Sequence, residues 1–156
     1  STGKFYTVLG DEIFPDGVDE NNPNITAGFL HFVDFSDLDN PVEVAKYELP
    51  GQGSHNYWIE DDILYVAMYG GGVRIVDISG DLLGDLYRQG REIGYIMTGT
   101  SNGYIPNATM SWGAQLYKGY VFYSDWNSGL GSSKVSELKP DNSKANQYIN
   151  KTPIID

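Results

Sequence analysis

The chain has 156 residues, with 21 acidic and 10 basic side chains, a net charge of −11 and no cysteine. The acidic balance excludes a nucleic-acid-binding protein, because such binding depends on clustered Lys and Arg. Disulfides and zinc–sulfur sites are excluded as well, and the longest apolar run, ILYVAMY at 63–69, is far shorter than the roughly 20 residues that span a bilayer.

The first part of the chain predicts three strands and an acidic insertion. The segments KFYTVL (4–9), GFLHFVDFS (28–36) and VEVAKYELP (42–50) are rich in the β-branched and aromatic residues that favour strands. Five carboxylates lie in the insertion, residues 10–27. The three residues before Lys4 are too few to supply a strand ahead of KFYTVL.

The middle part predicts a complete four-stranded unit. HNYWIE (55–60), ILYVAMY and VRIVDIS (73–79) are joined by a turn at Asp61–Asp62 and by a glycine turn, and a polar strand is expected around Leu86–Ile93 after the turn GDLLGD. The two central strands are apolar on both faces, as in a sheet that is packed on both sides.

The last part repeats this pattern less completely. WGAQLYK (112–118) and YVFYSD (120–125) predict two strands. Where the middle unit has an apolar third strand, this unit has Gly131-Ser132-Ser133-Lys134, so a bulge or a frayed strand is expected there. Residues 139–156 form a polar tail, or supply a strand to a neighbouring blade.

The spacing of these units predicts a β-propeller. Asp34 and Asp77 are about 43 residues apart, Tyr65 and Phe122 about 57 apart, and periods of about 40–50 residues with several short strands each are typical of propeller blades. We therefore expect an all-β fold in which residues 1–138 form a partial propeller. Its four-stranded antiparallel blades lie at about 4–50, 51–97 and 107–138, and the first lacks its innermost strand.

A closed propeller needs about 4–8 blades, so the remaining blades are expected from another part of the polypeptide or from a second chain. Without them, apolar strand positions such as Val66, Met68, Ile75 and Phe122 would face water, and such patches mark interfaces. A protein or carbohydrate ligand is a further possible partner.

The phrase VRIVDIS, together with GFLHFVDFSDLDNPVEVA at 28–45, resembles the LVIVD-repeat proteins, a WD-like propeller family of bacterial surface or secreted proteins. The resemblance covers about residues 4–138. It implies a propeller fold and an extracytoplasmic location, and it implies little about activity, because propellers host many functions.

The WD-like strand order would bring several loops to one face. That face would combine Ser54 and the insertion with the candidate ligand-binding residues, which are His55, Trp112, Asp125, Trp126 and Asn127. Two interpretations of the rings stay open. His55 either bonds neighbouring groups or belongs to a site, and the tryptophans either fill the core or stack on a ligand.

The other chemistry-bearing residues favour structural roles. Asp34 and Asp77 end strands before serine, which is typical of turn caps rather than of acid–base groups. His31 is expected to be a partly exposed strand residue. No cofactor is expected; calcium is the alternative, with Asp16, Asp19 and Glu20 as ligands, although their spacing is not that of an EF-hand. The Asn-x-Thr sequons at Asn24, Asn107 and Asn150 matter only in a eukaryotic secretory pathway.

The absence of a recognisable catalytic motif favours a non-enzymatic, extracytoplasmic binding or scaffold module in a larger protein or assembly. The alternative is an enzyme of hydrolase or lyase type, with its site at the mouth of the central channel around His55. A purely structural assembly unit is a third possibility.

Overall fold

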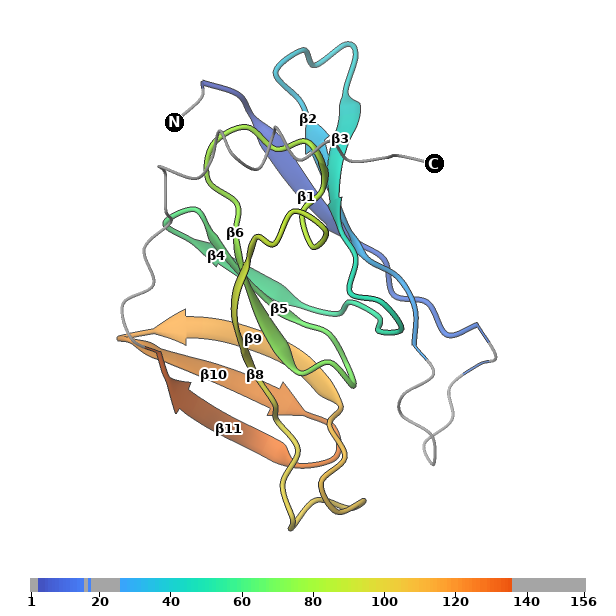
Figure 1. Cartoon of the computed structure of the whole chain (residues 1–156), viewed down its shortest axis with the longest axis vertical. Coiled ribbons are helices and arrows are strands. Elements are labelled where there is room, and N and C mark those ends of the chain that lie inside the picture. The colour runs from blue at the N-terminus through green and yellow to red at the C-terminus, as the bar shows by residue number, and fades with distance from the viewer. Residues whose placement is uncertain (1–2, 16, 18–25, 136–156) are drawn as a thin grey trace.

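The computed structural model describes residues 3–15, 17 and 26–135 (Figure 1). These residues form an all-β structure of three antiparallel sheets, with one short parallel pairing, and contain no helix that could cross a membrane. The predicted all-β class is therefore confirmed. The polar tail, residues 139–156, lies outside the described residues.

Sheet 1 has the strand order β1-β2-β3-β7, sheet 2 the order β4-β5-β6-β8 and sheet 3 the order β9-β10-β11. The strand bounds are β1 Tyr6–Gly10, β2 Leu30–Asp34, β3 Val42–Tyr47, β4 Tyr57–Glu60, β5 Ile63–Ala67, β6 Val73–Asp77, β7 Gly84–Asp85, β8 Glu92–Ile96, β9 Ser111–Tyr117, β10 Tyr120–Asp125 and β11 Gly129–Lys134. Apart from β7, which joins sheet 1 from the second unit, the strands of each sheet come from one of the three units expected from the sequence.

Three strands differ from the expectation. The segment GDLLGD, expected to be a turn, supplies β7, which pairs in parallel with β3 through Ala45 and Gly84, and the last strand of sheet 2 begins only at Glu92. The expected irregularity in β11 is also absent, because β10 and β11 pair in continuous register from Tyr120–Lys134 to Asp125–Gly129. Backbone pairing alone is enough to hold a strand of glycine and serine.

The sheets are stacked, with sheet 2 between the other two (Figure 1). All five residues of β5 are buried. Leu64 and Val66 belong to the core shared with sheet 1, whereas Ile63 and Tyr65 belong to the core shared with sheet 3. Alternate side chains of one strand therefore hold both neighbouring sheets, as the two-sided apolar pattern of ILYVAMY predicts.

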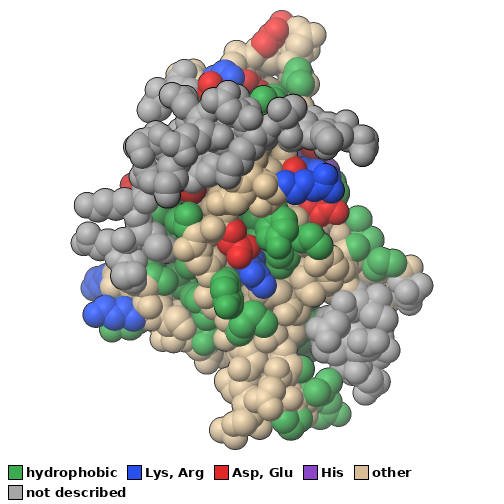
Figure 2. Space-filling model, in the orientation of Figure 1, with side chains coloured by type: hydrophobic (Ala, Val, Ile, Leu, Met, Phe, Trp, Pro, Cys, Tyr) green, Lys and Arg blue, Asp and Glu red, His purple; other side chains and the backbone are tan. Residues whose placement is uncertain are grey.

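The expected solvent exposure of the apolar strand positions was wrong for sheet 2. Val66, Met68 and Ile75 are at most 2% exposed because sheets 1 and 3 cover them. Phe122 in sheet 3 is 42% exposed, in line with the expectation. The space-filling view shows hydrophobic side chains that reach the surface between the polar groups (Figure 2).

Tight turns join the strands of sheet 2. Asp61 and Asp62 both have positive φ, 52° and 59°, as a two-residue hairpin turn requires. The β5–β6 turn ends at Gly72, whose φ is 74°, and its N–H donates to the carbonyl of Tyr69. A Cβ at position 72 would overlap the backbone carbonyl of Ile96 in β8.

Gly72→Ala tests this close approach, with Gly119→Ala as a matched control. Gly119 also has positive φ, 77°, but no atom lies near the position of its missing Cβ. We expect Gly119→Ala to lower the free energy of unfolding by about 1 kcal/mol through backbone strain. Gly72→Ala should cost about 1–3 kcal/mol more, because β8 must move. Urea denaturation measures both, and equal losses would contradict the role assigned to β8.

Candidate functional site

His55 lies at the boundary between sheets 2 and 3, just before β4. Its N–H donates to the carbonyl of Ala67 at 2.9 Å, and the N–H of Asn56 donates to the carbonyl of Trp112 in β9 at 3.2 Å. The ring atom Nδ1 lies 2.6 Å from the same Trp112 carbonyl. Because a carbonyl can only accept, Nδ1 carries the proton, and this fixes the ring with Nε2 directed elsewhere.

Three rings form a row at this boundary, which we call the aromatic row: His55, Trp112 and Trp126. His55 stacks on Trp112 with a centroid distance of 5.1 Å and an interplanar angle of 10°. Trp126 lies 4.9 Å from Trp112, tilted by 48°, and is 43% exposed. The structure therefore brings together three of the five residues predicted to bind a ligand, and one end of the row meets solvent.

Glu12, at the start of the insertion, reaches the other side of His55. Its Oε1 lies 3.3 Å from His55 Nε2 and accepts a hydrogen bond from the buried Tyr69 hydroxyl. Burial, followed by the hydrogen bond and the charge of Glu12, raises the pKa of Tyr69 far above its usual value, so this phenol remains a donor. Tyr69 also contacts the His55 ring edge-on.

A pocket of about 260 Å³ opens beside His55. It is lined by Gly10, Asp11, Glu12, Ser54, His55, Asn56 and Tyr57. Carboxylate, amide, hydroxyl and imidazole groups thus surround a space that is small compared with the roughly 300–1,000 Å³ of most ligand pockets. Of the predicted face, Ser54, His55 and part of the insertion line this pocket, whereas the other four candidate ligand-binding residues do not.

The other two predicted ligand-binding residues organise a loop instead. Asp125 is 4% exposed and accepts hydrogen bonds from the Thr98 hydroxyl and from the N–H groups of Met110, Asn127 and Ser128. Asn127 accepts from the N–H of Ile105 and donates to the carbonyls of Ile105 and Ala108. Their polar atoms are occupied by the protein, so we leave both out of the candidate site.

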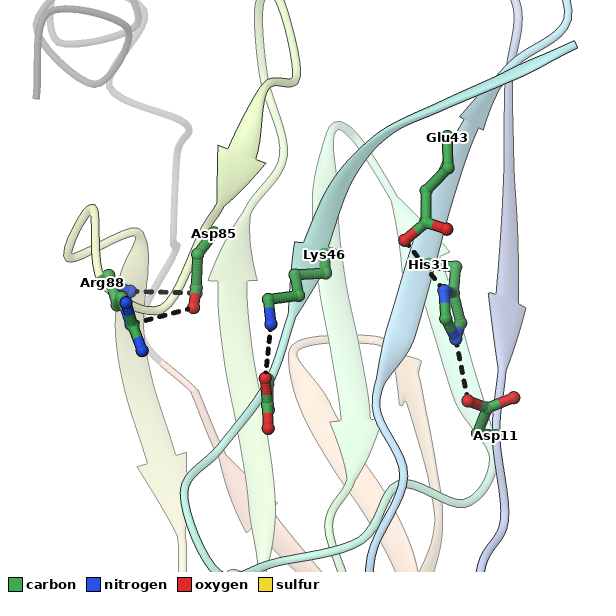
Figure 3. A network of polar contacts seen from close by, with 7 residues as sticks. Asp11, His31, Glu43, Lys46, Asp85 and Arg88 are labelled. Atoms are coloured by element: carbon green, nitrogen blue, oxygen red, sulfur yellow. Dashed lines mark hydrogen bonds and ion pairs between the residues drawn. The ribbon is translucent and has the colours of Figure 1, made fainter. Parts of the chain in front are cut away.

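His31, the second histidine, is held between two carboxylates (Figure 3). Its Nε2 lies 2.8 Å from Asp11 Oδ2 and its Nδ1 lies 2.9 Å from Glu43 Oε1. Partial burial lowers the pKa of His31, but the hydrogen bonds to Asp11 and Glu43 outweigh it and the net pKa is raised. It is a partly exposed strand residue, as predicted, but with a defined ionic role that its sequence context did not indicate.

The remaining sequence predictions have different outcomes. Asp34 and Asp77 cap turns as expected, since each accepts a hydrogen bond at 2.8 Å from the N–H of the serine two residues later. The calcium candidates Asp16, Asp19 and Glu20 lie outside the described residues, as do Asn24 and Asn150. Within the described part of the chain, no three His, Asp or Glu side chains gather as a metal ion would require.

Tyr69 and Asn56 are the site residues that sequence reasoning missed, whereas Glu12 was placed on the predicted face but not singled out. Glu12 was one carboxylate among five in the insertion, and Tyr69 appeared only as the end of an apolar strand. The one available indication was that Tyr69 immediately precedes three glycines. Its φ is positive, 42°, so its side chain does not follow the alternation of the strand before it.

Comparison with known proteins adds no identification. No family model, no curated protein and no solved structure matches this chain. The function must therefore be argued from the residues and the geometry described above.

Asp125→Ala tests the structural role of that carboxylate. Removing it leaves three N–H groups and one hydroxyl without their acceptor, so we expect a loss of about 2–4 kcal/mol in the free energy of unfolding, measured in urea. Asp34→Ala is the control, because Asp34 also caps a turn but lies more exposed, and its loss should be clearly smaller. Equal losses would indicate that the four-donor cluster contributes no more than an ordinary cap.

The raised pKa of His31 predicts a pH-dependent contribution to stability. A histidine whose folded pKa is raised stabilises the fold fully below its unfolded pKa of 6.5, and this contribution is lost as the pH rises through the folded value. His31→Gln should therefore be more destabilising at about pH 5.5 than at about pH 9, measured as the difference in unfolding free energy from the wild type. The same difference at both pH values would show that the ion pairs are not formed.

Proposed function

We propose that this chain is a non-enzymatic binding module built from propeller blades, and that it binds a neutral carbohydrate at the His55 pocket. The blade assignment is supported by three stacked sheets at the spacing of the sequence repeat. Together with the LVIVD-like phrases, this architecture suggests an extracytoplasmic module in a larger protein or assembly.

The single observation that carries the ligand class is that His55, the first ring of the aromatic row, also lines the polar pocket. Stacked rings offer a flat apolar surface to the C–H face of a sugar ring, whereas carboxylate and amide oxygens accept hydrogen bonds from its hydroxyls. Glu12 and Asn56 supply such oxygens beside His55. The pocket volume of about 260 Å³ suits one sugar ring rather than a large cofactor.

A neutral ligand fits the charges of this pocket better than an anionic one. Asp11 and Glu12 line it, and no Lys or Arg is among its described lining residues. In a chain of net charge −11, a phosphate or uronic acid would be repelled. Hydroxyl groups carry no such penalty.

One observation favours the alternative function, an enzyme of hydrolase or lyase type. His55 is fixed through Nδ1, and its Nε2 lies close to the carboxylate of Glu12 within the pocket. An imidazole held in one tautomer beside a carboxylate can move a proton to or from a bound substrate. The same residues would then act as an acid–base pair.

Binding can be measured by the fluorescence of the tryptophans in the aromatic row. Titration with neutral linear oligosaccharides of glucose, xylose, mannose and N-acetylglucosamine should change this fluorescence for at least one probe. Trp126→Ala should weaken binding of that probe by about fivefold to tenfold, since stacking on one ring contributes about 1–1.5 kcal/mol. Trp58→Ala is the control, because Trp58 is also partly exposed but lies outside the row.

The same mixtures separate the two functions. A binding module leaves the oligosaccharide intact, whereas a hydrolase or lyase shortens it, and His55→Gln would then abolish cleavage. If none of the probes binds at about 10 mM, the carbohydrate proposal is wrong.

A further inference from the structure

The three sheets share one rule for packing on the next sheet. In sheet 1, the positions that face sheet 2 include Leu30 and Phe32, both 0% exposed. The equivalent positions of sheet 2, one repeat later, are Val73 and Ile75, and they are buried against sheet 3 at 0% and 2% exposure. In the first two repeats, the same face is therefore buried by the repeat that follows.

Sheet 3 carries the same positions without a covering sheet among the described residues. Aligning Tyr65 with Phe122 places Ile63 on Tyr120 and Val73 on Leu130, in agreement with the pairing of β5 with β6 and of β10 with β11. Ile63 and Tyr65 are 1% and 2% exposed, but Tyr120 and Phe122 are each 42% exposed and Leu130 is 83% exposed. We call Tyr120, Phe122 and Leu130 the donor face.

The opposite end of the stack carries the complementary surface. Sheet 2 packs against sheet 1 through Leu64 and Val66. Sheet 3 packs against sheet 2 through Val121 and Tyr123. The equivalent residues of β1 are Thr7 and Leu9, and Val33 in β2 pairs with Thr7 on the same face. Leu9 is 52% exposed. We call Thr7, Leu9 and Val33 the receptor face.

We propose that a second copy of this chain covers the donor face with its receptor face. The structure favours a second copy as the occupant. Within the stack, the donor-type face of one sheet packs on the receptor-type face of the next, and this chain has an uncovered receptor face on sheet 1. Charge complementarity supports the same partner. Lys134 lies on the donor side, paired with Tyr120, whereas the carboxylates of Asp11 and Glu43 flank the receptor face around His31.

The same pairing of faces would limit the assembly to two copies. If each copy supplies one donor and one receptor face, two copies use both pairs of faces and leave neither uncovered. The six sheets formed by the described residues of two copies fall within the roughly 4–8 blades of closed propellers. This ring rests on the proposed propeller architecture, whereas the pairing of the two faces does not depend on it or on the carbohydrate site.

Sedimentation velocity of the full chain between about 1 and about 300 µM tests the proposal. We expect a concentration-dependent dimer, measured at an ionic strength that screens the net charge of −11 on each chain. Leu130→Asp in the donor face and Leu9→Asp in the receptor face should each weaken the dimer by at least about 100-fold. Leu38→Asp is the control: Leu38 is 76% exposed in the β2–β3 turn, and its replacement should leave the dimer unchanged.

A mixture of the two face variants distinguishes this pairing from any symmetric contact. The intact receptor face of the Leu130→Asp chain can still meet the intact donor face of the Leu9→Asp chain, so the mixture should form a heterodimer although each variant alone is mainly monomeric. All variants should keep the wild-type circular dichroism spectrum and oligosaccharide binding, since the replaced side chains are exposed and lie outside the His55 pocket. A wild-type chain that stays monomeric at all concentrations, a dimer that survives either substitution, or a mixture without heterodimer would overturn the proposal.

Discussion

The burial of β5 on both of its faces is the constraint on which the rest of the structure depends. Leu64 and Val66 contact the core of sheet 1, and Ile63 and Tyr65 contact that of sheet 3. Because a strand alternates its side chains between faces, a shift of one residue would exchange the two cores. The same strand pairs with β4 and thereby positions His55, which precedes β4, against Trp112 in β9. The candidate site is thus a consequence of how sheet 2 packs on sheet 3.

Local patterns made much of the fold predictable from the sequence. Runs of apolar β-branched and aromatic residues gave the strands of all three sheets, and Asp61–Asp62 gave the tight turn before β5. The caps at Asp34 and Asp77 were predictable for the same reason, since an aspartate bonds to backbone groups only two residues away. Repetition also indicated that His55, Trp112 and Trp126 would share a face, because equivalent loops of stacked sheets emerge together.

Features that depend on long-range contacts were not predictable. The short strand β7 exists only because β3 offers it a parallel edge, and nothing in the letters Gly84-Asp85 indicates a strand. Glu12 and Tyr69 are 57 positions apart, so only the folded chain shows their hydrogen bond. The sequence predicts a ligand-binding role for Asp125 because its loop is expected on the same face as His55. Its four partners come from the loop around Thr98 and Met110 and from its own turn, and together they make it part of the scaffold.

The aromatic row crosses the boundary between two sheets, and this links the site to the stability of the stack. His55 precedes the first strand of sheet 2, whereas Trp112 lies in β9 and Trp126 in the β10–β11 turn of sheet 3. A ligand that bound in the pocket and also reached the row, as proposed, would contact both sheets, so it would bind the packed arrangement and not the separated one. Any species that binds only the native state stabilises it in proportion to the logarithm of its concentration. The proposed ligand binding would therefore be coupled to the packing of sheet 2 on sheet 3, whose shared core includes Tyr65 and Val121.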